Sequence, residues 1–377
     1  MNYIKVLDEI FSQFDGPRFG VKFWNNETKY YGDAGSVHFV LIINKPSVIR
    51  RILAEGALGF GESFMDGGLE IEGDIEGYLK LRHQFRHVQP SFRLVVAKLL
   101  ATLTTPWTRK KQIAYHYDLG TDFFSLFLDR STMSYSAGSF LHEDDSLDAA
   151  QQSKLKMICD WLGINDGSNI LDIGSGWGGF AVYAAKKHKH QIKGCALSQK
   201  QIEYARSEVL NKQINNVSFE YCDVTKDLPP GDYDAAVMIE AIEHVGQAGL
   251  GNFLCSVHQT IHPGAPFYLQ FTGRYKPKQV DQWTLKYVFP GGHLPSKDEF
   301  LKAVEQSGFV VERFEDHTED YKKTMRLWIN AIEARQTEIE EMFDSKFFRL
   351  WKLWTHGAYV NFEIGDMSLF RVLLRKP

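Results

Sequence analysis

A short glycine-rich turn between an apolar run and a helical run constrains the fold of this chain more than any other segment. Residues 170–181 read Ile-Leu-Asp-Ile-Gly-Ser-Gly-Trp-Gly-Gly-Phe-Ala. The apolar run predicts a buried strand, and the residues after the turn predict a helix. Gly174 and Gly176 can adopt backbone angles that other residues avoid, so the main chain can lie directly against a ligand. The segment therefore predicts a strand–turn–helix unit with a ligand at the turn.

The spacing of the glycines leaves two interpretations of that ligand. Gly174–Gly179 contains the G-x-G-x-x-G spacing of dinucleotide-binding turns, while Asp172 followed by alternate glycines fits the S-adenosylmethionine loop of methyltransferases. The next predicted strand, Gln191–Leu197, ends about 20 residues after the turn, where a nicotinamide enzyme normally has an acidic residue for the ribose. Leu197 and Ser198 occupy that place here. Since neither residue is acidic, the methyl donor is the favoured ligand.

Composition excludes several other classes of protein. A chain of 377 residues is long enough for two domains, and its net charge of -4 argues against general nucleic-acid binding. No apolar run is long enough for a membrane span, and the N-terminus lacks the pattern of a signal peptide. The four cysteines have neither CxxC nor metal-ligand spacing, so we expect reduced thiols, a cytoplasmic location and no bound metal.

Residues 1–104 form the first of three regions. Val37–Ile43 predicts a strand and Pro46–Glu55 predicts a helix, so we expect a smaller N-terminal α+β domain. Several glycines predict turns in this region: Gly56, Gly59, Gly61, Gly67 and Gly68. Because no glycine fingerprint occurs here, we expect the domain to position lipid or membrane rather than to carry the reaction.

Residues 105–111 predict a linker to the third region, 112–377. Pro106 prevents a helix from continuing, and Arg109–Lys111 carries three consecutive positive charges. These charges are interpreted either as a solvated run or as attraction to an anionic membrane surface, worth about 1 kcal/mol per basic residue.

From about residue 150 the pattern alternates helices and strands, which predicts an open α/β sheet. The predicted helices are Ala149–Leu162, Gly178–Lys187 and Lys200–Asn211. The predicted strands are Asn169–Ile173, Gln191–Leu197, Val217–Tyr221, Asp234–Ile239 and Ala265–Thr272. Ligands of such sheets bind beyond the carboxyl ends of the strands. We therefore expect the site at 172–176, 196–201, 222–223, 240–244 and 270–272.

Motifs along most of the chain resemble one family. They are Gly61–Gly67, Tyr115–Gly120, Met133–Ser136, Ala150–Leu155, Leu171–Gly179, Glu243–Gly246, Lys286–Gly291 and Asp320-Tyr321. With these motifs the chain resembles the cyclopropane-fatty-acyl-phospholipid synthase family, which includes the mycolic acid cyclopropane synthases. The resemblance implies a Rossmann-like class I methyltransferase domain at 112–377. It also implies methyl transfer from S-adenosylmethionine to the double bond of an unsaturated acyl chain of a membrane phospholipid, by a protein peripheral on the inner face of the membrane.

The resemblance also implies which residues bind the donor. Gln201 matches a ribose ligand, Asp223 matches the acid that binds the adenine amino group, and Tyr135 and Ser136 match positions near the methionine end. Asp172 is expected either to stabilise the glycine loop or to touch the donor. The full predicted set is Tyr117, Tyr135, Ser136, Asp172, Gly174, Gly176, Leu197, Gln201 and Asp223.

The predicted catalytic residues are Glu243, Tyr321, Gln270 and His244. In the family the base is thought to be a bicarbonate held by a cysteine, a glutamate, a histidine and a tyrosine. Glu243 and Tyr321 match the glutamate and the tyrosine of this set. Ala137 stands in place of the cysteine, and Gln270 stands in place of the histidine. A second cysteine that the family often has near its C-terminus is also absent, since its position is at about Ala358 here. Glu240 is close to Glu243 in sequence and either supports it or is a salt-bridged helix residue, which is the favoured interpretation. The reaction class stands with these departures, while the product stays open between a cyclopropane and a methyl or methylene branch.

Two rival functions remain at this stage. One is methylation of a small soluble nucleophile such as an amine, a reaction that would not depend on lipid vesicles. The other is a lipid-binding protein on a methyltransferase scaffold, made conceivable by Ala137 and Gln270. The expected partner is a phospholipid bilayer with unsaturated acyl chains and no nucleic acid. The sequence allows a homodimer without determining the oligomeric state.

Overall fold

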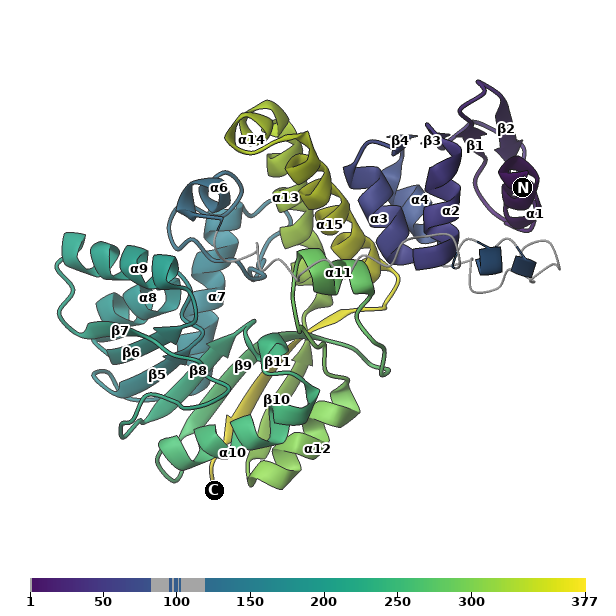
Figure 1. Cartoon of the computed structure of the whole chain (residues 1–377). Helices are drawn as coiled ribbons and strands as arrows, with labels where there is room; N and C mark the ends of the chain where they lie inside the picture. The colour runs from purple at the N-terminus through teal and green to yellow at the C-terminus, as the bar shows by residue number, and fades with distance from the viewer. Residues whose placement is uncertain (1, 83–94, 97, 101, 103–118) are drawn as a thin grey trace. The chain divides into compact units, whose positions relative to one another are not determined.

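The computed structural model describes residues 2–82, 95, 96, 98–100, 102 and 119–377 (Figure 1). They fall into two compact units. The N-terminal unit takes its residues from 1–113, 281–288 and 332–364, and the sheet unit from 114–280, 289–331 and 365–377. The predicted linker 105–111 lies outside the described residues, and the division at that linker stays a prediction.

The sheet unit is built on a seven-stranded sheet with the order β10-β11-β9-β8-β5-β6-β7. Strands β5 to β9 pair in parallel, β11 pairs antiparallel with β9, and β10 pairs antiparallel with β11. The strands are β5 (Asn169–Ile173), β6 (Gln191–Ala196), β7 (Val217–Tyr221), β8 (Ala235–Ile239), β9 (Pro266–Gly273), β10 (Val310–Asp316) and β11 (Ser368–Arg375). The predicted α/β fold class is confirmed.

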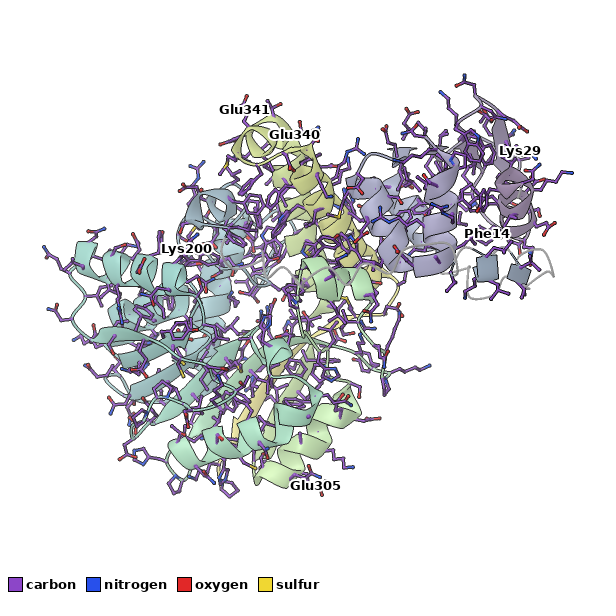
Figure 2. All side chains as sticks on the ribbon, in the orientation of Figure 1. Phe14, Lys29, Lys200, Glu305, Glu340 and Glu341 are labelled. Atoms are coloured by element: carbon purple, nitrogen blue, oxygen red, sulfur yellow. The ribbon has the colours of Figure 1, made fainter. Side chains whose placement is uncertain are left out.

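Helices cover both faces of this sheet (Figure 1). One apolar cluster includes Leu155, Phe180 and Ile202, from α7, α8 and α9, and a second includes Phe253 and Phe300, from α10 and α12. The helices are α6 (Thr121–Ser125), α7 (Leu147–Leu162), α8 (Gly179–His188), α9 (Gln199–Asn211), α10 (Leu250–Thr260), α12 (Lys297–Ser307) and α13 (Thr318–Ala334), with the short turns η2 (Ile242–His244) and η3 (Gln247–Gly249). Charged side chains such as Lys200 of α9 and Glu305 of α12 lie on the outside (Figure 2). Each helix is therefore apolar toward the sheet and polar toward solvent.

The N-terminal unit contains a four-stranded sheet with the order β2-β1-β3-β4. Its strands are β1 (Phe19–Lys22), β2 (Thr28–Tyr31), β3 (Phe39–Ile43) and β4 (Leu69–Gly73). Its helices are α1 (Tyr3–Phe11), α2 (Pro46–Glu55), α3 (Ala57–Met65), α4 (Ile75–Leu81), α11 (Gln282–Tyr287), α14 (Gln336–Met342) and α15 (Ser345–Glu363). The predicted strand and helix of this region are confirmed as β3 and α2. Within the described part of the chain, no helix has the length and apolarity needed to span a bilayer.

The turns predicted at Gly59 and Gly61 are wrong, because both residues lie inside helix α3. A Cβ atom at Gly61 would lie 2.2 Å from Cδ1 of Trp283, and one at Gly59 would lie 2.4 Å from the carbonyl oxygen of Arg51. These glycines therefore permit close packing of the helix. Gly56 and Gly67 do adopt left-handed angles, with φ of 58° and 68°.

A buried histidine in the N-terminal unit gives its stability a defined pH dependence. Nδ1 of His356 lies 2.9 Å from Oε1 of Glu76, and Nε2 lies 3.3 Å from Oε1 of Glu333. Burial alone lowers the pKa of His356, but the hydrogen bonds and charges of Glu333 and Glu76 outweigh it and raise the pKa above 6.5. The pKa of Glu333 is lowered to about 2, mainly by its hydrogen bond to His356.

We expect the unfolding free energy to fall as the pH rises from 6 to 8. A raised pKa in the folded state means that the contribution of His356 is complete below the unfolded pKa and is lost as the pH rises through the folded pKa. His356→Gln should weaken this dependence in urea unfolding at the two pH values. The exposed His142→Gln serves as the control, and an equal pH dependence in wild type and His356→Gln would contradict the assignment.

Candidate active site

The glycine turn at the end of β5 leaves open space beside its backbone. Gly174 and Gly176 adopt left-handed angles, with φ of 78° and 52°. The amides of Gly174 and Ser175 both donate to the carbonyl oxygen of Cys195, at 2.9 Å. A Cβ atom at Gly176 would meet nothing within 4 Å, whereas one at Gly174 would lie 2.5 Å from Cβ of Ala241. The turn therefore offers room for a ligand and lies against the segment that follows β8.

Two buried oxygens at this turn lack a partner. Oδ2 of Asp172 and Oγ of Ser175 make no hydrogen bond to any described residue. Burial raises the pKa of Asp172 to about 7. Buried polar atoms are nearly always hydrogen-bonded in folded proteins. Unpaired oxygens beside an open backbone fit a ligand that carries donor groups, such as S-adenosylmethionine.

Three other predicted donor ligands follow the carboxyl ends of β6 and β7. Leu197 is 48% exposed, and Gln201 is buried in the first turn of α9. The carboxylate of Asp223 accepts hydrogen bonds from Thr225 and forms an ion pair with Lys226 at 2.9 Å, which together lower its pKa. All three lie at the expected edge of the sheet, and their contact with the donor stays a prediction. Tyr117 lies outside the described residues.

Tyr135 and Ser136 lie between an aromatic cluster and helix α7. The ring of Tyr135 stacks on Trp328, with centroids 5.1 Å apart, and meets Phe124 edge-on at 5.2 Å. Oγ of Ser136 accepts a hydrogen bond from Nζ of Lys154 at 2.7 Å. Burial lowers the pKa of Lys154 to about 8. These contacts hold the segment beside apolar rings.

Glu240 is the centre of a partly buried polar cluster. It follows β8 in a bend with a φ of 49°. Its Oε1 accepts hydrogen bonds from the amide of Ala137 at 2.9 Å and from Nε2 of Gln270 at 2.7 Å, and its carboxylate also hydrogen-bonds Tyr321. The interpretation of Glu240 as a salt-bridged helix residue is wrong, because the end of β8 directs the side chain toward these donors.

Glu243 lies in η2 at the same edge of the sheet. Its Oε1 accepts a hydrogen bond from the amide of Thr272 at 2.6 Å, while its buried Oε2 has no partner among the described residues. Burial and the nearby charge of Glu240 raise the pKa of Glu243 to about 8. Burial lowers the pKa of the adjacent His244 to about 4. At neutral pH this segment therefore presents a largely protonated carboxyl group and a neutral imidazole.

Gln270 and Tyr321 complete the cluster. Gln270, on β9, is 1% exposed, and its Oε1 accepts hydrogen bonds from Tyr268 and from Nε of Arg371. The ring of Tyr321, on α13, meets Trp328 edge-on, with centroids 6.2 Å apart. Burial and the charge of Glu240 raise the pKa of Tyr321 well above its usual value. The structure thus brings together Gln270 and Tyr321 through Glu240, with Glu243 and His244 a few residues further along the chain.

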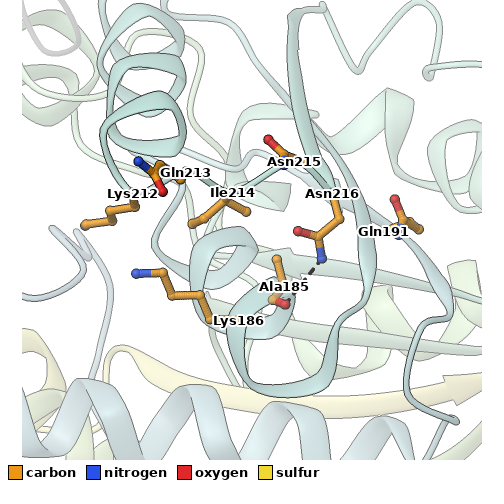
Figure 3. Close-up of a pocket in the computed structure, with 8 residues that line it drawn as sticks. All are labelled: Ala185, Lys186, Gln191, Lys212, Gln213, Ile214, Asn215 and Asn216. Atoms are coloured by element: carbon orange, nitrogen blue, oxygen red, sulfur yellow. Dashed lines mark hydrogen bonds between the residues drawn. The ribbon is translucent and has the colours of Figure 1, made fainter.

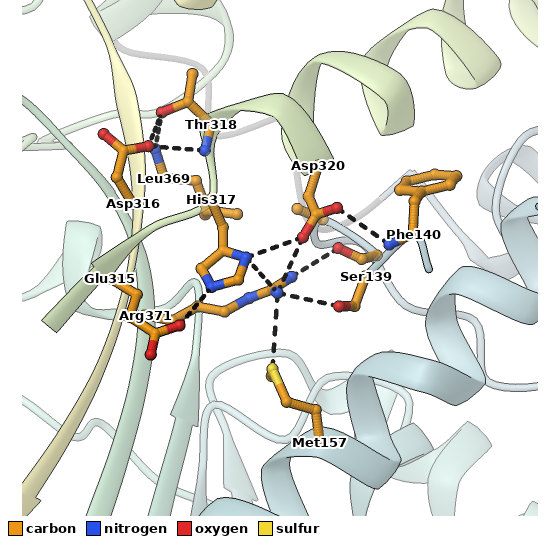
Figure 4. A network of polar contacts seen from close by, with 12 residues as sticks. Ser139, Phe140, Met157, Glu315, Asp316, His317, Thr318, Asp320, Leu369 and Arg371 are labelled. Carbon is orange, nitrogen blue, oxygen red and sulfur yellow. Dashed lines mark hydrogen bonds and ion pairs between the residues drawn. The ribbon is translucent and has the colours of Figure 1, made fainter. Parts of the chain in front are cut away.

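Sequence reasoning missed the arginine that supports this cluster. Arg371, on β11, is fully buried, and its guanidinium donates to Oδ2 of Asp320 at 3.0 Å, to Oγ of Ser139 at 3.2 Å and to the carbonyl oxygen of Gly138 at 2.7 Å (Figure 4). Together with its bond to Gln270, these contacts hold the segment after Ser136 against β9 and α13. The motif Asp320-Tyr321 was the one sequence signal for a polar partner here.

A cavity lies at the other end of the parallel strands. It has a volume of about 470 Å³, and its lining includes Lys186, Gln191, Lys212 and Asn216 (Figure 3). Because Gln191 begins β6 and Asn216 precedes β7, this cavity lies at the amino ends of the strands. None of the predicted site residues lines it. Among the described residues, no cluster of histidine, cysteine and acidic side chains is suited to hold a metal ion.

Comparison with known proteins gives consistent matches. The family model described as mycolic acid cyclopropane synthetase matches residues 105–372, and a domain of unknown function matches residues 6–87. A cyclopropane-fatty-acyl-phospholipid synthase of Escherichia coli is 31% identical over 91% of this chain and 89% of its own length. A tuberculostearic acid methyltransferase of Mycobacterium tuberculosis is 29% identical over 88% of this chain and 82% of its own length. A solved mycolic acid cyclopropane synthase, complexed with SAH and CTAB, is 27% identical with a TM-score of 0.64, over 69% of this chain and 96% of its own length.

Proposed function

We propose, from the premise that this chain belongs to the mycolic acid cyclopropane synthetase family, that it methylates the double bond of an unsaturated fatty acyl chain of a membrane phospholipid. The chain is an S-adenosylmethionine-dependent methyltransferase, and the proposed product is a cyclopropane fatty acid. The observation that carries the proposal is the polar cluster of Glu240, Gln270 and Tyr321 beside the glycine turn. Ala241 links the two, since it follows Glu240 and packs against Gly174.

The residues at the carboxyl ends of β5, β6 and β7 are proposed to hold the donor. S-adenosylmethionine, when bound, supplies an electrophilic methyl group on a sulfonium. The open backbone at Gly176 and the unpaired Oδ2 of Asp172 support this position. Gln201 and Asp223 are proposed to contact the nucleoside, and Tyr135 is proposed to contact the methionine end.

The chemistry of an alkene explains why such a site needs apolar rings next to polar groups. An alkene is a weak nucleophile, so the double bond must be held in line with the methyl group and away from water. Methyl transfer leaves positive charge on the acyl chain, which the faces of Tyr135 and Trp328 would stabilise by cation–π contacts. A proton must then leave, and the set Glu243, His244, Gln270 and Tyr321 is proposed to surround the reacting carbons.

A bilayer is proposed as the partner surface, with the protein acting at its cytoplasmic face. The name of the Escherichia coli relative, which refers to a phospholipid, supports this substrate class. The names of other relatives refer to tuberculostearic acid and to sphingolipid C9-methylation. A methyl- or methylene-branched chain is therefore the alternative product.

The test incubates purified protein with S-adenosylmethionine and vesicles of a mono-unsaturated phospholipid. We expect released acyl chains to gain about 14 Da, the mass of one CH₂ unit, in mass spectrometry. Vesicles of the saturated phospholipid should show no gain. NMR of the product then separates a ring from a branch. Donor binding without any mass gain would overturn the proposed function.

A further inference from the structure

We infer that Glu240 is the general base of this reaction, so that a carboxylate of the chain itself accepts the proton that leaves the methylated acyl chain. The inference rests on the proposed function and names a residue that the sequence pattern assigned to a structural role.

The first support is the set of donors around this carboxylate. Glu240 receives hydrogen bonds from the amide of Ala137, from Nε2 of Gln270 and from the hydroxyl of Tyr321. Burial raises the pKa of Glu240, and these three donors act against that rise because they favour the charged carboxylate, which is the form a base requires. The family resemblance implies that a bound bicarbonate accepts hydrogen bonds at this position. In the structure the carboxylate of Glu240 accepts them.

The second support is the contrast with Glu243. Glu243 accepts hydrogen bonds only from backbone amides, that of Thr272 and its own, and has an unpaired Oε2. Two buried carboxyl groups this close cannot both be charged at low cost, and the group with fewer donors keeps the proton. The pKa of about 8 for Glu243, raised by burial and by Glu240, agrees with this division. Glu240 is then the ionised member of the pair.

The third support is backbone geometry. Glu240 has a φ of 49°, in the left-handed region that non-glycine residues seldom occupy. Such strain costs of order 1 kcal/mol or more and is concentrated at functional sites. The bend carries the carboxylate from the end of β8 to the edge where Ala241 packs against Gly174. A base at this position lies beside the proposed donor site.

The proposed step balances as follows. The π electron pair of the double bond forms a C–C bond to the transferred methyl carbon, and the C–S bond breaks with its pair on sulfur. Glu240 then accepts a proton from the new methyl group. The electron pair of that C–H bond forms the third C–C bond of the ring, and Glu240 is left as a carboxylic acid that returns its proton to solvent.

The main test is Glu240→Gln, which keeps the size of the side chain but removes its charge. We expect turnover to fall by about 10²- to 10⁴-fold, the usual contribution of general base catalysis. Donor affinity by calorimetry and the melting temperature should stay close to those of wild type. Glu305→Gln, on the exposed face of α12, is the matched control and should retain activity. Wild-type turnover in Glu240→Gln would overturn the inference.

A second variant keeps the test decisive if glutamine disturbs the fold. Glu240→Gly removes the carboxylate, and glycine tolerates the positive φ. We expect added formate to restore part of its turnover in a saturable manner, without effect on wild type. Carbon-13 NMR should detect bound labelled bicarbonate in Glu240→Gly and none in wild type. Bicarbonate binding by wild type, or a wild-type rate that falls in bicarbonate-free buffer, would overturn the inference.

The two proposals fail in different ways. If wild-type protein transfers no methyl group to any unsaturated phospholipid, the proposed function is wrong and the inference falls with it. If wild type transfers methyl groups and the Glu240 variants do so equally well, only the inference is wrong.

Discussion

Arg371→Met is expected to lower the free energy of unfolding by about 3–5 kcal/mol, the cost of breaking a buried ion pair by removing one partner. The guanidinium of Arg371 is fully buried and donates to Asp320, Ser139, Gly138 and Gln270. Methionine fills a similar volume but supplies no donor, so the partly buried carboxylate of Asp320 loses its cation. Urea unfolding followed by tryptophan fluorescence measures the loss.

The matched control is Arg375→Met, four residues further along the same strand. Arg375 pairs with Glu312 at the surface, where ion pairs contribute about 1 kcal/mol or less. The two variants share the substitution and the strand but differ in burial. Similar losses of stability in both would contradict a special role for the Arg371 network. Because Arg371 also positions Gln270, its variant should lose turnover, while Arg375→Met should not.

Gly174→Ala is expected to weaken donor binding at least about tenfold, or about 1.4 kcal/mol, and to lower the melting temperature. The new Cβ atom would lie 2.5 Å from Cβ of Ala241, so either the turn or the segment after β8 must move. The residue also has a φ of 78°, which costs an alanine roughly 1–2 kcal/mol. Calorimetry with S-adenosylhomocysteine and thermal unfolding measure the two effects.

Two further glycine variants separate backbone strain from loss of the donor site. Gly176→Ala meets no protein atom within 4 Å, so its methyl group would occupy ligand space and weaken binding with a smaller change in melting temperature. Gly167→Ala, at a φ of 86° in an exposed loop with nothing within 4 Å, carries the strain without touching the site. If Gly174→Ala, Gly176→Ala and Gly167→Ala bound the donor with equal affinity, the glycine turn would not be the donor site.

Much of the sheet could be predicted because its signals are local. The predicted strands Asn169–Ile173 and Val217–Tyr221 agree with β5 and β7 at both ends. Those for β6 and β8 differ by one residue at one end, and that for β9 is shifted by one residue at both ends. Buried strands of a parallel sheet read as short apolar runs bounded by turns, and the alternation with helices then orders them. Strands β10 and β11 were not predicted. The run Ser368–Arg375 contains Arg371, which the pattern does not mark as buried although it is fully enclosed.

The role of Glu240 could not be predicted for a related reason. In sequence it lies three residues before Glu243, within a stretch that a helical pattern also fits. Its partners Ala137 and Gln270 lie 103 and 30 residues away along the chain. Which side chain fills a buried space depends on which segments meet there. The hydrophobic periodicity of one segment does not indicate which distant segments it will contact.

By itself, the sequence determined the glycine turn, the order of the strands β5 to β9 with their helices and the edge of the sheet where we expect a ligand, because backbone preference and hydrophobic periodicity act between near neighbours in the chain. Only the tertiary structure decided that Ala137, Glu240, Gln270 and Tyr321 share one buried cluster with Arg371 behind it. The physical reason is that buried polar groups must find partners wherever folding brings donors and acceptors together, whatever their separation in sequence.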